Sequence, residues 1–460
     1  MKVLFVNPPN KPFTSRQLLI EPIDLLSLAS YIQKLGHEVK VLDMDVKRMM
    51  PEQVMICLQE FLPEVVVIPF DYHVPLHTTE SIAGVFEIAK QAKKLKAKVL
   101  VGGKIATYFP NKFIYPGSPV EVTISGEMEH ALKELLSMDN WQDKSLSAIP
   151  GIAYWNENNI KQSQGHHIFN LNQLPIPDRR LVDLADYINV RSLLSSRGCS
   201  MQCSFCATPG FWGAWRGREP QQVVEEIALL VNNYGAKRVL FLDDNALFDK
   251  ERMRKICRLI IEQKLKVNLG CLAALNLFDE TIMRLMYKAG FRWIHYGAES
   301  GSSRILKNVG KKVNRERIKD VIRQTQKIGF RVRTSWIIDL PGMTEKSLDE
   351  TRELILASQS DEIRLHYLAL RLGSRLYNEF AGEVPNPPSQ YIHGDKPNLN
   401  ATAVEQFLLV DKVNALIAEL GNLGYILIRN QRDLAKLNRR SNRTKKIVSL
   451  CPLRYDLGWG

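Results

Sequence analysis

The chain has 460 residues, of which 45% are apolar and 24% charged, the balance of a globular protein with two or three domains. Its 62 Lys and Arg exceed its 49 Asp and Glu, and the net charge of +13 attracts nucleic acid, an anionic substrate or an acidic peptide without choosing among them. No apolar run reaches the roughly 20 residues of a membrane span. Met1 leads directly into a strand pattern instead of a signal peptide, so the sequence predicts a cytoplasmic protein.

Residues 1–140 alternate short apolar runs with stretches of helical period. This order predicts a Rossmann-like, doubly wound parallel sheet, which binds ligands at the carboxyl ends of its strands. No Gly-x-Gly-x-x-Gly follows the first strand, so a dinucleotide site is not supported. The five expected strands are Lys2–Asn7, Val39–Leu42, Val65–Pro69, Lys98–Val101 and Val120–Ile124.

Residues 141–190 lack a long helical period and are rich in proline and turn residues, so we predict a linker that contains a hairpin.

Residues 191–380 then repeat a strand and helix pattern six times, with polar residues where the strands end. This predicts a partial (β/α)6 barrel of TIM-like design, whose active face lies at the strand ends. Residues 381–460 form a small C-terminal region that is basic and partly helical. Few aromatic residues separate its basic side chains, which disfavours nucleic-acid binding.

The strongest chemical signal is a loop in which Cys199, Cys203 and Cys206 follow the spacing Cys-x-x-x-Cys-x-x-Cys. Three cysteines in a tight polar loop supply three ligands of a 4Fe–4S cube and leave one iron open for chemistry. A zinc site would need a fourth ligand at short spacing, and the next cysteines, Cys257 and Cys271, stand alone. The spacing therefore favours a cluster over zinc and over three buried free thiols.

With Phe205 ahead of Cys206, this loop resembles the signature of the radical S-adenosylmethionine (SAM) superfamily. The resemblance implies that the open iron chelates SAM and that an external donor of flavodoxin or ferredoxin type supplies the electron that cleaves it. The 5′-deoxyadenosyl radical then removes hydrogen from an unactivated carbon of the substrate.

The first domain resembles the cobalamin-binding domain of one radical SAM branch. Gly102-Gly103 and Gly126-Glu127 follow successive strands, and Asn7-Pro8-Pro9 follows the first strand. The His that the motif expects after the paired glycines is missing, and Phe70 stands where a small turn residue is expected. Whether cobalamin binds here or the domain is a bare scaffold stays open at this point.

The resemblance also assigns SAM-binding roles to residues at three strand ends. Asp243 and Asp244 match the acidic pair near the SAM amino group, although a helix N-cap is an alternative role for them. Glu299, followed by Ser300, matches the carboxylate that accepts hydrogen bonds from the ribose. Ile338 lies in the segment whose backbone meets the adenine.

Two expectations depend on strand periodicity. Arg333 and Ser335 share one face of their strand, where the guanidinium can hold the SAM carboxylate in a bidentate pair, with a surface salt bridge as the alternative. Cys271 ends the third barrel strand, and a thiol near the active mouth can return a hydrogen atom to a substrate radical. Core packing is the alternative for Cys271.

Together these features predict a radical SAM enzyme with a 4Fe–4S cluster and SAM, and with cobalamin-dependent methyl transfer to a small-molecule or peptide substrate as the main outcome. One alternative is a cobalamin-free dehydratase or epimerase in which Cys271 is the hydrogen donor. The other is an RNA- or peptide-binding protein that uses the cluster structurally.

Overall fold

The computed structural model describes residues 1–9, 19–70, 79–138, 140–165, 167–168, 170–380, 403–428 and 446–449. The chain divides into two compact units, which we describe separately. Of the described residues, the first contains those within Met1–Ile188 and Gly210–Arg216, and the second contains those within Asn189–Pro209 and those from Gly217 onward. None of the helices among the described residues combines the length and the apolar character that a membrane span requires.

The first unit is built on a seven-stranded sheet with the order β2-β1-β3-β4-β5-β6-β7. Strands β1 to β5 pair in parallel, and their apolar runs are buried because helices cover both faces of the sheet. The strands are β1 Lys2–Asn7, β2 Glu38–Asp43, β3 Val65–Pro69, β4 Lys98–Gly102, β5 Val122–Ile124, β6 Ile152–Asn156 and β7 Asn159–Gln162. This confirms the doubly wound sheet predicted from the sequence.

The hairpin that we expected in the linker is part of this sheet. Strand β6 pairs antiparallel with β5, and β7 pairs with β6 at the edge. Ile152 and Tyr154 belong to the core of the first unit, so burial of these apolar side chains holds the hairpin on the sheet.

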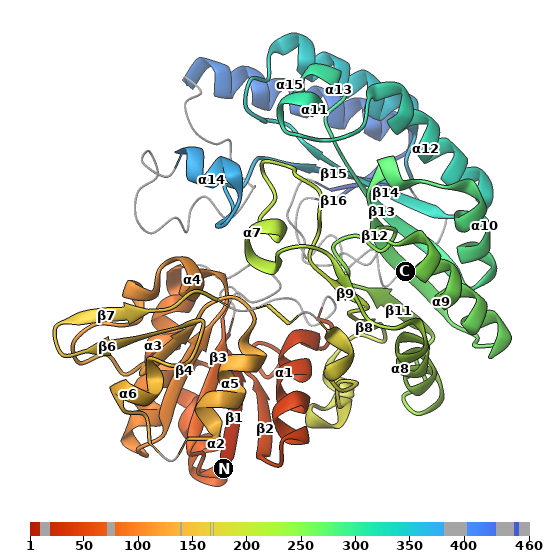
Figure 1. Ribbon diagram of the computed structural model, residues 1–460. Helices are drawn as coiled ribbons and strands as arrows, with labels where there is room; N and C mark the ends of the chain where they lie inside the picture. Colours follow the sequence, from red (N-terminus) through yellow and green to blue (C-terminus); the bar gives the residue numbers. More distant parts are fainter. Residues whose placement is uncertain are drawn as a thin grey trace. The chain divides into compact units, whose positions relative to one another are not determined.

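The helices of the first unit lie on the two faces of the sheet, where α1 packs with α5 and α2 packs with α3 (Figure 1). They are α1 Ile23–Lys34, α2 Val54–Phe61, α3 Thr79–Lys94, α4 Lys104–Tyr108, α5 Met128–Leu136 and α6 Asp143–Leu146. A further short helix, α7 Thr208–Trp212, is divided between the two units.

The second unit contains an eight-stranded sheet with the order β16-β17-β15-β14-β13-β12-β11-β8, in which every pair is parallel. Six of these strands form the expected partial barrel: β8 Arg191–Leu193, β11 Arg238–Phe241, β12 Asn268–Ala273, β13 Phe291–Glu299, β14 Arg331–Ile337 and β15 Glu362–His366. The C-terminal region adds β17 Ile447–Ser449 beside β15 and β16 Ile426–Ile428 at the edge. We predicted only a helix there, because runs of three apolar residues are too short to identify as strands.

Helices follow one another along the outside of this sheet (Figure 1). They are α8 Pro220–Asn232, α9 Lys250–Glu262, α10 Glu280–Lys288, α11 Ser303–Asn308, α12 Arg315–Ile328, α13 Glu345–Ser358 and α15 Ala403–Asn422, whereas α14 Arg375–Phe380 lies apart from this row. Asp249, Asp279 and Asn314 cap three of them, because each side chain accepts a hydrogen bond from a backbone N–H of the first turn.

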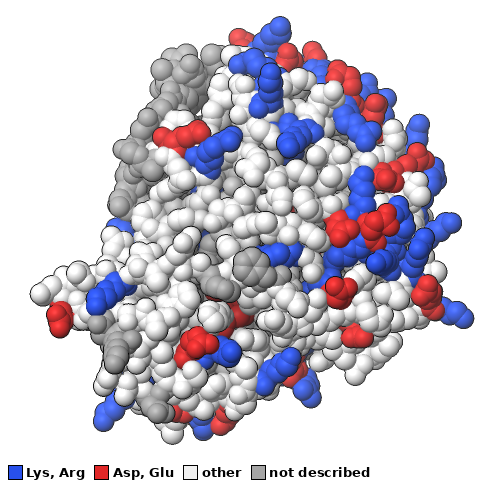
Figure 2. All heavy atoms as spheres, in the orientation of Figure 1, with Lys and Arg blue, Asp and Glu red and all other residues white. Residues whose placement is uncertain are grey.

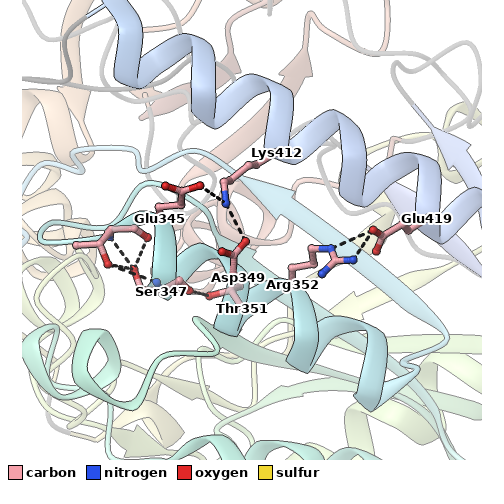
Figure 3. A network of polar contacts seen from close by, with 8 residues as sticks. Glu345, Ser347, Asp349, Thr351, Arg352, Lys412 and Glu419 are labelled. Carbon is pink, nitrogen blue, oxygen red and sulfur yellow. Dashed lines mark hydrogen bonds and ion pairs between the residues drawn. The ribbon is translucent and has the colours of Figure 1, made fainter.

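Helix α15 packs with the outer helices through both apolar and charged side chains. Leu416 and Leu420 belong to the core of the second unit. Figure 3 shows the charged contacts: Lys412 Nζ lies 2.8 Å from an oxygen of Asp349, and Arg352 pairs with Glu419. Since exposed ion pairs contribute little, on the order of 0–1 kcal/mol each, the apolar contacts provide most of the stability of this docking.

Basic side chains gather over α9 on the face seen in Figure 2, where Lys255, Arg258 and Lys264 are exposed. Exposed Glu251 and Glu262 lie on the same helix. This mixture is typical of a solvated helix surface. The basic residues from Arg432 to Lys445 lie outside the described residues.

The barrel strands present two different faces. Ile294 and Tyr296 of β13, like Val332 and Trp336 of β14, belong to a core shared with the outer helices. The alternate residues therefore face the inside of the barrel, and the register places them in rows across neighbouring strands.

Candidate active site around the cysteine loop

The cysteine loop begins immediately after strand β9, Ser196–Arg197, and its entry is fixed by Asp243 at the end of β11. The buried Asp243 carboxylate accepts hydrogen bonds from the backbone N–H groups of Ser195, at 2.7 Å, and Ser196, at 3.1 Å, and also from the Ser195 hydroxyl. Gly198 has a φ of 81°, which an L side chain rarely adopts, and so it permits the turn into the loop. Asp243 thus positions the loop entry by accepting hydrogen bonds from its backbone N–H groups.

The middle of the loop is held by backbone hydrogen bonds from two distant segments. Ser204 N–H donates to the Val309 carbonyl and Leu376 N–H donates to the Ser204 carbonyl, both at 2.9 Å. Gly310 approaches the loop so closely that an added Cβ would lie 2.6 Å from the carbonyl oxygen of Gln202. The segment after α11 therefore supports the loop between its cysteines.

The three thiols are half-buried and close enough to influence one another electrostatically. Burial raises the pKa of Cys199 to about 11, and it also raises the pKa of Cys203 and of Cys206. Metal coordination reverses this preference, because the thiolate is the ligand. The residues therefore fit an iron–sulfur cluster: three thiols gathered in a loop whose backbone is held by other segments.

Within the described residues, no three His, Cys, Asp or Glu side chains form a group that could hold a metal ion. The cysteines of a cube ligate three different irons and need not converge on one point. This observation therefore concerns single-ion sites and leaves the cluster as a prediction.

The structure separates the roles of the two adjacent acids. Asp243 faces the backbone of the loop entry, whereas Asp244 is half-buried, accepts a hydrogen bond from the Thr208 hydroxyl at 2.8 Å and raises the pKa of Cys199 and of Cys206. Asp244 thus lies beside the thiols, where a carboxylate can interact with a ligand of the cluster. The N-cap of the following helix is Asp249.

Glu299 is held in an unusual conformation at the end of β13. Its φ is 66°, the parallel register shifts between Gly297 and Glu299, and its carboxylate pairs with Lys311 at 3.1 Å. Gly297 leaves space for this pair, because an added Cβ would lie 2.1 Å from the Glu299 Oε1 atom and would force the carboxylate to move. Burial lowers the pKa of the Lys311 ammonium, but Glu299 and Cys203 outweigh that effect and raise it. Strained backbone of this kind persists where surrounding contacts fix it, often at functional sites.

Lys311 was not predicted from the sequence. It lies in a stretch with no recognisable motif, and its distance of 12 residues from Glu299 gives no helical or strand relation that would have identified it.

Two other predicted cofactor residues use their side chains for the fold. The hydroxyl of Ser300 lies 3.2 Å from that of Thr351 and accepts a hydrogen bond from the Ser302 N–H. Ile338 places its side chain in the core, and its backbone N–H donates to the His366 carbonyl. Both side chains thus contribute to the fold, and the expected contact of the Ile338 backbone segment with adenine stays a prediction.

The expected pairing of Arg333 with a ligand carboxylate also needs correction. Arg333 is 2% exposed, pairs with buried Glu362 and lies 4.7 Å from the centre of the Trp293 ring. It is therefore neither a surface salt bridge nor a free carboxylate-binding group. Ser335, on the same face, hydrogen bonds to Nε2 of His295 at 2.6 Å.

Cys271 is the clearest error among the predicted site residues. It is fully buried in the core shared by the strands and the outer helices, and Cys257 of α9 is one of the groups that influence its pKa. The strand continues to Ala273, so Cys271 is not its last residue. The structure therefore supports core packing and gives no support for Cys271 as a hydrogen donor.

In the first unit, the glycines that follow β4 and β5 are joined by Thr107. Its hydroxyl donates to the Gly103 carbonyl at 2.7 Å and accepts from the Gly126 N–H at 3.0 Å. A Cβ on Gly102 would lie 2.3 Å from the Met128 sulfur, so a larger residue at this strand end would force the Met128 side chain to move. Thr107 and these buried glycines bring the two turns together at the carboxyl ends of the strands, the edge at which such sheets bind ligands.

Phe70, which stands where a small turn residue is expected, packs into the protein interior. Its ring is fully buried and makes an edge-on contact with Phe113 at 6.4 Å between ring centres. The ring therefore fills the interior of the first unit.

Comparisons with known proteins agree with both halves of this description. A family model described as the radical SAM superfamily matches residues 193–355, and one described as the B12 binding domain matches residues 12–136. An uncharacterised methyltransferase of Pyrococcus horikoshii is 28% identical over 368 residues, which cover 78% of this chain and 77% of that protein. The anaerobic magnesium-protoporphyrin IX monomethyl ester cyclase of Synechocystis is 22% identical, with 80% and 75% covered.

The fold is also found among solved structures. The radical SAM methyltransferase TsrM of Kitasatospora setae, with tryptophan and a SAM analogue bound, superposes with a TM-score of 0.71 at 21% identity, covering 83% of this chain and 76% of that one. The chain therefore carries a B12-binding domain, residues 12–136, ahead of a radical SAM domain, residues 193–355, and it shares the fold of TsrM.

Proposed function

We propose that this radical SAM enzyme is a cobalamin-dependent methyltransferase that acts on an unactivated carbon. The observation that carries the proposal is the presence of both domains in one chain, which a simple hydrogen-abstracting enzyme does not need. Two of the similar proteins, from Pyrococcus horikoshii and Kitasatospora setae, are named as methyltransferases. When bound, the reduced cluster supplies an electron to SAM, and cobalamin supplies a carrier for the methyl group.

Different residues around the cysteine loop would bind the cluster and different parts of SAM. Cys199, Cys203 and Cys206 would ligate the cluster, and Asp244 would accept hydrogen bonds from the SAM amino group beside it. Glu299 would accept hydrogen bonds from the ribose. Because Lys311 and the strained backbone already fix the Glu299 carboxylate, little conformational entropy remains to be lost when the ligand binds.

The strand ends of the first unit would hold cobalamin. The turns at Gly103 and Gly126 would contact the cofactor, and Thr107 keeps these two turns together. The sequence contains no Asp-x-His-x-x-Gly motif, which supplies a cobalt-ligating His in other cobalamin proteins, so cobalt would lack that ligand.

The test measures the two cofactors separately. After anaerobic reconstitution with iron, sulfide and hydroxocobalamin, gel filtration should leave about one corrinoid and roughly four irons per chain, the iron count of one cube. With dithionite and SAM, the protein should release 5′-deoxyadenosine. The triple variant Cys199→Ala, Cys203→Ala, Cys206→Ala should lose the iron and the SAM cleavage but retain the corrinoid.

Cys271→Ala is the matched control, because it removes a thiol of the same barrel from the core and should leave the iron count unchanged. Full cluster content in the triple variant would show that other residues ligate the iron. Loss of corrinoid from the wild-type protein during gel filtration would refute the cobalamin-dependent reaction and favour the alternative of a bare scaffold.

A further inference from the structure

Cys203 lies between two contacts that the segment after α11 makes with the cysteine loop. The Val309 carbonyl accepts a hydrogen bond at 2.9 Å from the backbone N–H of the residue that follows Cys203. A Cβ on Gly310 would lie 2.6 Å from the carbonyl oxygen of the residue that precedes Cys203. Lys311 is the next residue of this segment, so backbone contacts on both sides of Cys203 hold Lys311 close to that thiol.

The Lys311 side chain is directed into the protein and only 13% of it is exposed. Its ammonium lies 3.1 Å from the Oε1 atom of Glu299, and Nζ would lie 3.0 Å from a Cβ on Gly297. A nearby carboxylate favours the charged form of an amine. Lys311 therefore places a fixed positive charge beside the cysteine loop, at the end of β13.

The charges around the three thiols are unevenly distributed. Burial raises the pKa of Cys203, and the strongest charge that acts against burial is Lys311, whose effect exceeds the opposite effect of Glu299. Burial also raises the pKa of the other two thiols, and there Asp244 raises it further. The pair of Lys311 and Glu299 is thus not neutral in its effect on Cys203, because its positive member acts more strongly.

The charge of Lys311 matters for electron transfer to a cluster bound at this loop. Reduction adds one negative charge to the cluster and its thiolate ligands, so a fixed positive charge stabilises the reduced form more than the oxidised form. The potentials of iron–sulfur clusters depend on such charges, on hydrogen bonds to the sulfurs and on solvent exposure. Because water screens a largely buried charge only weakly, its effect extends to the cluster.

We propose that the Lys311 ammonium, held beside Cys203, raises the reduction potential of the cluster and so favours its reduction by a one-electron donor. In this step the donor loses one electron and the oxidised cluster gains it, and no proton or other group is transferred. The inference rests on the proposed function only in taking the three cysteines as ligands of a 4Fe–4S cluster. This role of Lys311 is distinct from its contact with Glu299, which fixes a carboxylate for the ribose.

The test is a redox titration of the reconstituted full-length protein with dithionite and mediators, in which electron paramagnetic resonance measures the reduced cluster. Lys311→Met keeps the length of the side chain and removes its charge. The equilibrium constant for reduction should fall about tenfold, which is about 59 mV for a one-electron couple. Lys311→Arg keeps the charge and should retain most of the wild-type potential. No SAM is present, so contacts of Lys311 with SAM cannot cause the shift.

A double variant covers the case in which Lys311→Met is unstable, because loss of one partner from a buried pair is strongly destabilising. Lys311→Met combined with Glu299→Gln removes both charges, and its potential should still lie below that of the wild type, since the ammonium has the stronger effect at Cys203. Lys312→Met is the matched control. Lys312 is the neighbouring lysine but is exposed, so water screens its charge and its loss should leave the potential unchanged.

Iron content shows that each variant holds a full cluster before its potential is measured. A wild-type potential in Lys311→Met or in the double variant overturns the proposal, as does an equal fall in Lys311→Arg or in Lys312→Met. The titration needs neither SAM cleavage nor corrinoid, so the proposal can fail while cobalamin-dependent methyl transfer stands. Absence of a cluster from the wild-type protein would overturn both.

Discussion

Replacing Gly310 by Ala should disturb the cysteine loop without changing any proposed ligand. Gly310 has a φ of 72°, and the new Cβ would lie 2.6 Å from the carbonyl oxygen of Gln202, between Cys199 and Cys203. Left-handed backbone costs about 1–2 kcal/mol for an L residue, and overpacking against a fixed neighbour costs about 1–3 kcal/mol. The oxygen is backbone, so relief requires movement of the loop itself.

Gly235→Ala separates these two costs. Gly235 has a φ of 62°, but an added Cβ would meet nothing within 4 Å. The free energy of unfolding of this control variant should fall only by the cost of the left-handed backbone conformation, roughly 1–2 kcal/mol. It belongs to the same unit and lies between α8 and β11, away from the loop residues in sequence.

Iron content after reconstitution and the guanidinium midpoint of unfolding measure the difference. Gly235→Ala should keep a full cluster with a modestly lower midpoint. Gly310→Ala should have the lower midpoint of the two and lose a substantial share of its iron. If the two variants match in both measurements, the contact between Gly310 and the loop does not support the cluster, and the reasoning is wrong.

Two further predictions concern buried residues of the barrel. Glu362→Gln should destabilise the protein by about 3–5 kcal/mol at pH 7, because Arg331 and Arg333 would lose their shared buried carboxylate. Burial alone would raise the pKa of Glu362, but Arg333 and Arg331 lower it from 4.5, so its contribution is present above pH 4.5 and lost as the pH falls further. Unfolding midpoints at decreasing pH should therefore fall more steeply in the wild type than in the variant. Cys271→Ala should cost about 1 kcal/mol of stability, as small core truncations do, and leave 5′-deoxyadenosine formation unchanged; loss of that activity would contradict its assignment to the core.

The layers of both units could be predicted from the sequence because parallel strands buried on two faces are continuous apolar runs separated by helical periods. The same property explains the error at Cys271. A period of two groups Leu269, Cys271 and Ala273 on one face, but both faces of a barrel strand are buried, so the pattern does not say which face is the inside. Only the packing of the helices identifies that face.

The cysteine loop could be identified because its three cysteines are close together in the sequence. The segments that support the loop could not be predicted. Val309, Gly310 and Leu376 are more than 100 residues away from it, and they contact it through backbone atoms, which do not depend on the residue type. Arg333 shows the same limit: its partner Glu362 is 29 residues away, and register alone brings them together.

The acidic pair at the end of β11 shows how neighbouring residues of one type can have different roles. Asp243 is fully buried, and its carboxylate oxygens accept hydrogen bonds from Ser195 and Ser196. Its charge therefore stabilises the conformation of the loop entry without a bound ligand. Asp244, one residue later, is half-buried beside Cys199 and Cys206. A strand end that directs consecutive side chains to opposite sides can thus position a loop with one acid and present the other to a ligand of that loop.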